Sequence, residues 1–203
     1  SSLMKILAGI ESSDCGGEVK FMKDIRVAFL DQSFNFNPHH TIFEEVYAHM
    51  GNIAPEIREY EAAVASGNSS RLERAIASMD ASGSWDIEHN IRQVLSQLKI
   101  EQLNQPMSEL SGGEAKRVAL ACMILQNADF LIMDEPTNHL DIEIIEYLEN
   151  FLQRSRCTLF MVTHDRYFLD RVCNTIMEID RGNLYTYRGN YTQYLEKREE
   201  RYA

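Results

Sequence analysis

Short apolar runs alternate along this chain with longer stretches in which apolar residues recur every three or four positions. The runs Ile25–Leu30, Phe130–Met133 and Thr158–Thr163 have the length of buried parallel strands. The stretches Leu110–Leu125 and Ile142–Leu152, before and after the middle run, have the spacing of helices. This order predicts an α/β fold with a mostly parallel sheet flanked by helices.

Smaller elements complete the pattern. Glu18–Phe21 has the composition of a further short strand, and Thr175–Ile179 is expected to pair with Leu184–Tyr187 around the turn Arg181-Gly182-Asn183. These segments predict a small antiparallel β part. Further helices are expected at Ser1–Gly9, at Tyr167–Val172 and from Asn190 onward.

Between Pro38 and Pro106 the pattern is helical throughout. Amphipathic helices are expected over Thr41–Met50, Ala54–Ser66, Ser70–Ala81 and Ser84–Leu98. The segment holds 10 acidic residues (Glu44, Glu45, Glu56, Glu59, Glu61, Glu73, Asp80, Asp86, Glu88, Glu101) and 5 basic ones (Arg58, Arg71, Arg74, Arg92, Lys99). The simplest explanation of these charged residues is that they form the solvent-exposed faces of the helices. We therefore expect a helical subdomain inserted into the α/β unit.

Composition limits the kind of protein. The chain has 203 residues, of which 44% are hydrophobic, enough for a core in one large domain or two small ones. No apolar run approaches the roughly 20 residues that span a bilayer, and the first residues do not resemble a signal peptide. We expect a cytoplasmic protein without a membrane partner. The cysteines (Cys15, Cys122, Cys157, Cys173) form no Cys-x-x-Cys pair, which argues against a zinc site.

Candidate chemistry begins where the middle apolar run ends, at Asp134 and Glu135. Two carboxylates at the end of a buried strand are costly unless a ligand requires them, and the carboxyl edge of a parallel sheet is where α/β proteins hold ligands. The simplest chemistry that fits is that Asp134 binds a metal ion and Glu135 binds a water molecule. For an Asp-Glu pair alone, a solvated acidic turn is the simpler alternative.

Two other strand ends carry polar side chains. His164 follows Thr158–Thr163, and its position matches that of Glu135 on the neighbouring strand. Gln32 follows Ile25–Leu30. A lone histidine is more often structural, and a glutamine at a strand end is usually a surface residue. For His164, the position that matches Glu135 favours a site residue. The alternative role of Gln32 is to carry a metal or water contact to a moving subdomain.

The stretch Leu110-Ser-Gly-Gly-Glu114 opens a long helix, which Ser111 can cap. The glycines Gly112 and Gly113 allow another molecule's phosphate to approach the backbone closely. The amides and the dipole of a helix N-terminus favour such an anion. A simple turn before a helix is the alternative for any Ser-Gly-Gly sequence.

The order of these motifs (Gln32, Leu110-Ser-Gly-Gly-Glu114, Asp134-Glu135, Asn138-His-Leu-Asp141, His164) resembles that of ATP-binding-cassette (ABC) domains over essentially the whole chain. Two details resemble the ABC-F family, and its Uup-like branch, rather than transporters. One is Glu135-Pro-Thr-Asn-His-Leu-Asp141, and the other is the tail Tyr187-Arg-Gly-Asn-Tyr191 before a charged helix. The insertion between Gln32 and Leu110 resembles the arm of the first of the family's two cassettes.

The resemblance implies a P-loop NTPase-type fold and Mg²⁺-dependent ATP hydrolysis at a site shared with a second cassette of the same chain. It also implies action on the ribosome through rRNA, tRNA or ribosomal protein. Asp134, Gln32 and the hydroxyl of Ser1 would hold Mg²⁺. Glu135 would orient or deprotonate the attacking water, and His164 would contact the γ-phosphate.

The remaining nucleotide contacts are also implied by the resemblance. Ser1 and Ser2 would end a phosphate-binding loop, and Asp141 would belong to the D-loop. Ser111, Gly112 and Gly113 would bind the nucleotide of the other cassette. The chain contains no Gly-x-x-x-x-Gly-Lys loop, so we expect the 203-residue chain alone to be inactive.

The expected division of the chain follows these motifs. Residues 1–37 would start the ATP-binding core and its antiparallel β part, and 38–109 would form the helical subdomain with the arm-like insertion. Residues 110–187 would hold the signature helix and the core with Walker B and His164, and 188–203 would start an interdomain linker helix.

Two alternatives remain open. The chain could be the ATPase subunit of a transporter, although the Asn138-His139 sequence and the tail favour ABC-F. It could also be a DNA-associated ATPase, although the helices between Thr41 and Leu98 are too short for a long coiled coil. The formal net charge of −11 argues against a general affinity for nucleic acid.

Overall fold

The chain forms two compact units, and each is described by itself. The computed structural model describes residues 2–14, 16–32, 34–50 and 55–202, with only the backbone of Tyr202. One unit comprises Ser1–Gln32 and Asp129–Ala203, and the other comprises Ser33–Ala128. Ser1, Cys15 and the expected helix start at Ala54 lie outside the described residues. Residues 110–128, which the expected division grouped with the ATP-binding core, belong to the second unit.

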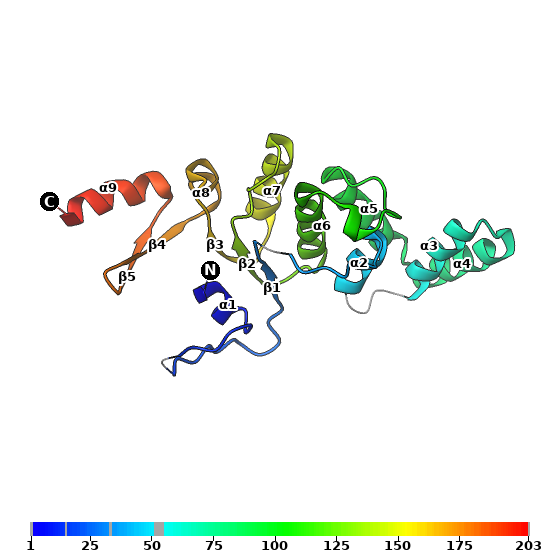
Figure 1. Ribbon diagram of the computed structural model, residues 1–203, viewed down its shortest axis with the longest axis horizontal. Coiled ribbons are helices and arrows are strands. Elements are labelled where there is room, and N and C mark those ends of the chain that lie inside the picture. The colour runs from blue at the N-terminus through cyan, green and yellow to red at the C-terminus, as the bar shows by residue number, and fades with distance from the viewer. Residues whose placement is uncertain (1, 15, 33, 51–54, 203) are drawn as a thin grey trace. The chain divides into compact units, whose positions relative to one another are not determined.

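A three-stranded parallel sheet forms the centre of the first unit (Figure 1). Its strands are β1 (Val27–Leu30), β2 (Phe130–Asp134) and β3 (Thr158–Val162), in the order β1-β2-β3. Leu30 lies opposite Met133, and Asp134 lies opposite Val162. Residues 131–134 of β2 are buried, as expected for the middle strand of a parallel sheet. The predicted α/β class and parallel sheet are confirmed.

A side-chain clasp joins the sheet at its amino edge. The backbone N–H and the guanidinium of Arg26, just before β1, donate hydrogen bonds to the carboxylate of Asp129, just before β2. These hydrogen bonds lower the pKa of Asp129 below its usual value. The expected strand Ile25–Leu30 begins at Val27, directly after Arg26.

The prediction of a strand at Glu18–Phe21 is wrong. Residues 16–22 have no regular secondary structure, and Val19 and Phe21 are 39% and 45% exposed. A strand needs a neighbour for its backbone hydrogen bonds, and none of the described residues pairs with this segment. The ring of Phe21 instead lies 5.8 Å from that of Phe130. The antiparallel β part that we expected within residues 1–37 is therefore absent from the described residues there.

The small antiparallel sheet is the hairpin of β4 (Thr175–Asp180) and β5 (Asn183–Arg188). Its turn consists of Arg181 and Gly182, whose φ angles of 48° and 80° are those of the tight turn that joins twisted strands. Asn183, which we expected in the turn, pairs with Asp180.

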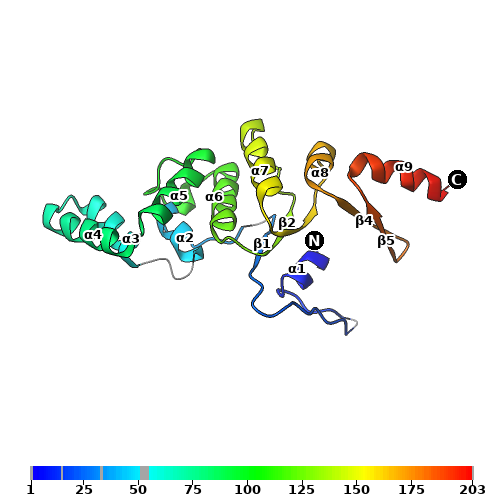
Figure 2. The same ribbon diagram turned by 180° about the vertical axis from the view of Figure 1, so that it is seen from behind.

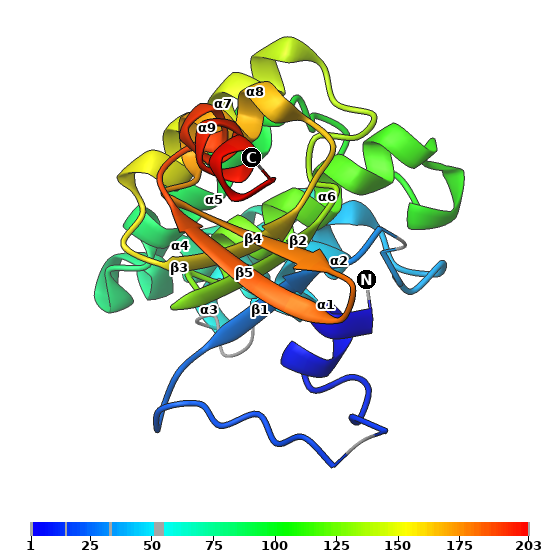
Figure 3. The same cartoon turned by 90° about the vertical axis from the view of Figure 1, so that its left-hand side faces the viewer.

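Helix α9 (Tyr191–Tyr202) lies beside the hairpin (Figure 3). Arg198 pairs with Glu178, and Arg201 pairs with Glu178 and Asp180. The guanidinium of Arg201 also lies 3.7 Å from the ring centre of Tyr185. The tail helix is thus attached to the hairpin by charge and aromatic contacts.

Three further helices belong to the first unit: α1 (Ser2–Leu7), α7 (Ile142–Arg154) and α8 (Arg166–Val172). α1 contacts β2, and α7 contacts α8. Met4, Ile144, Leu148 and Phe168 supply buried apolar side chains.

The second unit consists of helices and contains no strand among its described residues (Figure 2). They are α2 (Ile42–His49), α3 (Pro55–Ser66), α4 (Ser69–Ser82), α5 (Trp85–Gln97), the 3₁₀ turn Met107–Glu109 and α6 (Gly112–Leu125). Residues 118–125 of α6 are all buried, and α6 contacts α2 and α5. The four helices expected between Pro38 and Pro106 are confirmed.

Helices α3 and α4 form a hairpin that is joined to α5 by polar and aromatic contacts. Arg92 of α5 pairs with Glu61 of α3 and with Glu88 of its own helix. The rings of Tyr60 and Trp85 meet edge to face at 5.0 Å. The middle of α3 is therefore attached to α5.

No helix in the described ranges combines the length and the apolar character needed to cross a membrane.

Candidate functional site

The polar side chains predicted to share a site meet at the carboxyl edge of the parallel sheet. Gln32 follows β1, Asp134 ends β2, and His164 follows β3. Because the strands are parallel neighbours, their carboxyl ends lie along one edge. The structure thus brings Gln32, Asp134, Glu135 and His164 together within the first unit.

Asp134 is the most deeply buried of these groups, with 1% of its surface exposed. The side-chain amide of Gln32 donates a hydrogen bond to Asp134 Oδ1 at 3.2 Å. A carboxylate and an amide oxygen are hard ligands of the kind that Mg²⁺ takes, together with water and substrate phosphates. The described residues contain no cluster of three or more His, Cys, Asp or Glu side chains that could hold a metal. Mg²⁺ at this position would be held by Asp134 and, after rotation of its amide, by the oxygen of Gln32, with phosphate and water as its other ligands.

Glu135 leaves the strand in a left-handed conformation, with φ of 47°. Its backbone N–H donates to the carbonyl of Val162 at 2.8 Å, which keeps the residue beside β3. Its Oε2 accepts hydrogen bonds from the hydroxyl of Thr163 at 3.2 Å and the backbone N–H of His164 at 3.3 Å. A non-glycine residue in this conformation costs of order 1 kcal/mol or more, and such residues gather at functional sites.

His164 presents its ring to solvent, since 97% of its side chain is exposed. Its Nε2 lies 3.4 Å from Glu135 Oε1. An exposed ring therefore stands beside a buried carboxylate at this edge of the sheet. The roles predicted for Glu135 and His164 in hydrolysis stay predictions.

Thr163 was not predicted as a site residue. Besides donating to Glu135, its hydroxyl accepts a hydrogen bond from the N–H of Asp165 at 3.1 Å. Asp165 in turn caps α8 by accepting from the N–H of Phe168. A threonine between an apolar strand and a histidine was the sequence signal for this role, because a hydroxyl there can both donate and accept.

Asp141 was predicted to contact nucleotide as part of the D-loop. Its side chain accepts a hydrogen bond from the N–H of Ile144 at 3.0 Å, and it is the N-cap of α7. An N-cap aspartate satisfies an otherwise unpaired helix amide. The structure therefore gives Asp141 a capping role, and its contact with nucleotide stays a prediction.

Substitution of Asp141 separates these two roles. Asn also caps helices well, whereas Ala does not. We expect Asp141→Ala to lower the free energy of unfolding by about 1 kcal/mol and Asp141→Asn to lower it much less. Thermal melting of both variants measures this difference, and equal melting temperatures would contradict the capping role. A loss of ATP hydrolysis in both variants, whatever their stability, would show that the carboxylate acts on the nucleotide.

The glycine-rich stretch lies in the second unit, at the start of α6. The hydroxyl of Ser111 accepts from the N–H of Glu114, and the N–H of Ser111 donates to the Glu114 carboxylate at 2.8 Å. Hydrogen bonds from Ser111 lower the pKa of Glu114 below its usual value. Gly112 is exposed, and a Cβ added there would meet no heavy atom within 4 Å. Gly112 is therefore not required by local packing.

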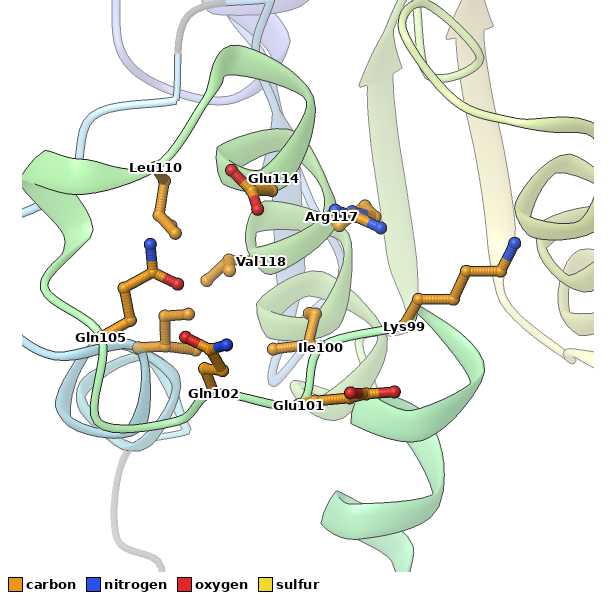
Figure 4. A pocket seen from close by; sticks show the side chains of 10 residues that line it. Lys99, Ile100, Glu101, Gln102, Gln105, Leu110, Glu114, Arg117 and Val118 are labelled. Carbon is orange, nitrogen blue, oxygen red and sulfur yellow. The ribbon is translucent and has the colours of Figure 1, made fainter.

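A pocket lies beside this end of α6 (Figure 4). Its volume is about 320 Å³, and apolar side chains of Ile42, Ile100, Leu110 and Val118 line it together with Glu114 and Arg117 of α6. The rest of its lining comes from Lys99, Glu101, Gln102 and Gln105.

The N-terminal serines are placed only in part. Ser1 lies outside the described residues, so its role on Mg²⁺ stays a prediction. Ser2 is exposed in the first turn of α1. The three cysteines within the described residues, Cys122, Cys157 and Cys173, are free thiols.

The chain is similar to known proteins. A family model described as ABC transporter matches residues 1–138, and a second model with the same description matches residues 177–203. The whole chain is 44% identical to the uncharacterized ABC transporter ATP-binding protein YfmR of Bacillus subtilis, of which it covers 33%. It is 36% identical to the energy-dependent translational throttle protein EttA of Mycobacterium tuberculosis, of which it covers 38%.

A solved structure, titled RNase-L Inhibitor, superposes on 97% of this chain with a TM-score of 0.61 at 23% identity, and the match covers 34% of that protein. This likeness concerns the fold. The chain spans about a third of the length of these relatives. Family membership supports nucleotide binding and ATP hydrolysis, with Mg²⁺ as the usual metal of the family. On the matched residues and the shared motif order, the chain belongs to the ATP-binding-cassette family, in its ABC-F branch.

Proposed function

We propose that this chain is the first cassette of a two-cassette ABC-F ATPase that acts on the ribosome in the cytoplasm. The observation that carries the proposal is the convergence of Gln32, Asp134, Glu135 and His164 at one edge of the sheet. Phosphoryl transfer depends on positioning and charge stabilisation more than on covalent chemistry. At this edge, the buried carboxylate of Asp134 would bind the metal, and the buried carboxylate of Glu135 would position the water.

Each residue has one task in the proposed reaction. Asp134 and the amide oxygen of Gln32 would hold Mg²⁺, which neutralises charge on the phosphates. Glu135, oriented by Thr163 and the N–H of His164, would accept a proton from the attacking water. The ring of His164 would donate to the γ-phosphate.

The second cassette would complete the site. Ser111, Gly112 and Gly113 begin a helix whose N-terminal amides and dipole favour an anion. We assign them to the γ-phosphate of the nucleotide held by the other cassette. ATP then stabilises the closed pair of cassettes, and hydrolysis releases it. A polypeptide limited to these 203 residues has neither the second cassette nor a Gly-x-x-x-x-Gly-Lys loop, and we propose that it is inactive alone.

The ribosome is proposed from the name of the EttA relative, a translational throttle protein, and from the helical insertion. The basic tail is a weak candidate for contact with RNA, because Arg198 and Arg201 are paired with Glu178 and Asp180. Lys197 donates to the carbonyl of Arg188 at 2.5 Å. The hairpin of α3 and α4 is the better candidate contact, with ribosomal protein, tRNA or rRNA as the partner.

Sedimentation with ribosomes tests this proposal. The complete protein should pellet with ribosomes in the presence of a slowly hydrolysed ATP analogue and much less without it. Replacing residues 55–81 by a short Gly-Ser linker should lower the pelleted fraction several-fold, because it removes the hairpin. Basal ATP hydrolysis without ribosomes should stay near the parental rate, since the catalytic edge lies in the other unit.

Two results would contradict it. Unchanged pelleting of the hairpin deletion would make the hairpin a structural subdomain. Absence of pelleting by the parent, together with co-purification of a membrane protein, would favour the ATPase subunit of a transporter.

A further inference from the structure

We propose that Thr163 is a positioning residue for hydrolysis. Its hydroxyl holds Oε2 of Glu135, which leaves Oε1 as the oxygen that takes the proton of the attacking water. This inference rests on the proposed function, because it concerns the same carboxylate. It goes beyond that function by assigning separate tasks to the two oxygens of Glu135.

The hydrogen-bond partners of the Thr163 hydroxyl fix the direction of its proton. The hydroxyl oxygen accepts a hydrogen bond from the backbone N–H of Asp165 at 3.1 Å. A hydroxyl has a single proton to donate, and Oε2 of Glu135 lies 3.2 Å away as its acceptor. Because the N–H of Asp165 can only donate, the order of these two hydrogen bonds cannot be reversed. Thr163 is therefore the donor to Glu135.

Helix α8 holds the donor to Thr163 in place. The carboxylate of Asp165 caps α8 by accepting a hydrogen bond from the N–H of Phe168 at 3.0 Å. The side chain of Phe168 is fully buried, so the first turn of α8 is anchored in the core. The N–H of Asp165 therefore belongs to the fixed start of a helix, and it restricts the orientation of the Thr163 hydroxyl.

The two oxygens of Glu135 have different surroundings. Oε2 accepts hydrogen bonds from the hydroxyl of Thr163 and from the backbone N–H of His164 at 3.3 Å. Oε1 accepts no hydrogen bond from the residues that the structure describes, and Nε2 of the exposed His164 ring lies 3.4 Å from it. The lone pairs of Oε2 are thus engaged, and those of Oε1 are available to a proton.

The proposed proton transfer takes place at Oε1. One O–H bond of the water breaks, and its proton moves to Oε1. The water oxygen bonds to the γ-phosphorus while the bond from that phosphorus to the bridging oxygen of ADP breaks, which gives ADP and inorganic phosphate. Oε1 then releases its proton to solvent. Thr163 keeps its own proton throughout, so it acts by orienting Glu135 and not as an acid or a base.

A purely structural role of the Thr163 hydroxyl is the alternative. Glu135 has a φ of 47°, and its side chain is only 6% exposed. A buried carboxylate needs hydrogen-bond donors whatever its function. The two roles differ in what changes when the hydroxyl is lost. A structural hydroxyl supports the local fold in any background, whereas a positioning hydroxyl supports kcat through the carboxylate of Glu135 alone.

Steady-state ATP hydrolysis by variants of the complete protein tests the inference. Thr163→Val keeps the shape of the side chain and removes the hydroxyl. It should lower kcat about tenfold and change KM for ATP less than about twofold, because only the orientation of the reacting group is lost. Thr163→Ser keeps the hydroxyl and should recover most of the lost rate. The matched control is Thr158→Val at the exposed start of β3, which should change neither constant.

A second measurement isolates the path through Glu135. In Glu135→Gln, the amide oxygen can accept the two hydrogen bonds of Oε2, and the NH₂ group then takes the place of Oε1. Adding Thr163→Val to this variant should slow single-turnover hydrolysis no further, since the group that Thr163 positions is already gone. A structural hydroxyl would slow hydrolysis in both backgrounds by the same factor.

Each contrary outcome has its own meaning. Slow hydrolysis by Glu135→Gln with a parental kcat in Thr163→Val would overturn the inference and leave the proposed function intact. Equal losses in Thr163→Val and Thr163→Ser would also overturn it, as would a tenfold further loss in the Glu135→Gln background. Parental hydrolysis by Glu135→Gln would overturn the proposed function and this inference together.

Discussion

Glu135→Gln should slow ATP hydrolysis by the complete protein about 10²-fold or more, the loss typical of removing a general base. The amide oxygen of glutamine can still accept the hydrogen bonds that Glu135 receives from Thr163 and His164, so the local structure should persist. ATP binding should remain, and the closed form should accumulate because its release requires hydrolysis. Steady-state release of phosphate and gel filtration with ATP measure both effects.

The matched control for this variant is Glu146→Gln, which removes a carboxylate from an exposed position of α7. It should hydrolyse ATP at the parental rate. Parental turnover in Glu135→Gln would show that another group activates the water. If the variant lost both ATP binding and turnover, Glu135 would instead contact the phosphates or the metal.

Gly112→Asp should nearly abolish hydrolysis in the complete protein while leaving its melting temperature close to that of the parent. The added side chain enters open space, because no heavy atom lies within 4 Å of the new Cβ. An acidic residue in the first turn of a helix is favourable for stability. The cost falls on function, since the new carboxylate would face the γ-phosphate held by the other cassette.

Gly112→Ala is the companion variant because it adds a Cβ without charge. We expect intermediate activity if close approach of the phosphate to the backbone is what glycine permits. If the melting temperature fell in parallel with activity in both variants, Gly112 would be needed for the structure of the turn before α6 and not for contact with a phosphate.

The catalytic edge could be predicted because strand pattern and chemistry agree there. The run Phe130–Met133 is too apolar for a surface loop, and it ends abruptly at Asp134 and Glu135. Parallel pairing then required His164 to lie near Glu135, as the separation of 3.4 Å shows. Asp141 also carried a capping signal, an aspartate just before an amphipathic helix, which the resemblance to the D-loop obscured.

Other features depended on contacts that the sequence does not specify. The alternation Glu18-Val-Lys-Phe21 is typical of a strand, yet a strand exists only if another segment accepts its hydrogen bonds. The clasp between Arg26 and Asp129 joins residues 103 positions apart, and the pairing of Arg92 with Glu61 depends on how α3 packs on α5. No local pattern predicts such partners.

The placement of the catalytic groups at strand ends divides the chain into parts that can and cannot change in length. One extra residue in β2 would reverse the side-chain alternation beyond it and move Asp134 into the place that Glu135 now holds. The same insertion at the tip of the α3–α4 hairpin, around Gly67, would alter only a surface turn. Changes in chain length are therefore expected to be tolerated far better at the tip of this hairpin than in β2, because they leave the catalytic edge undisturbed.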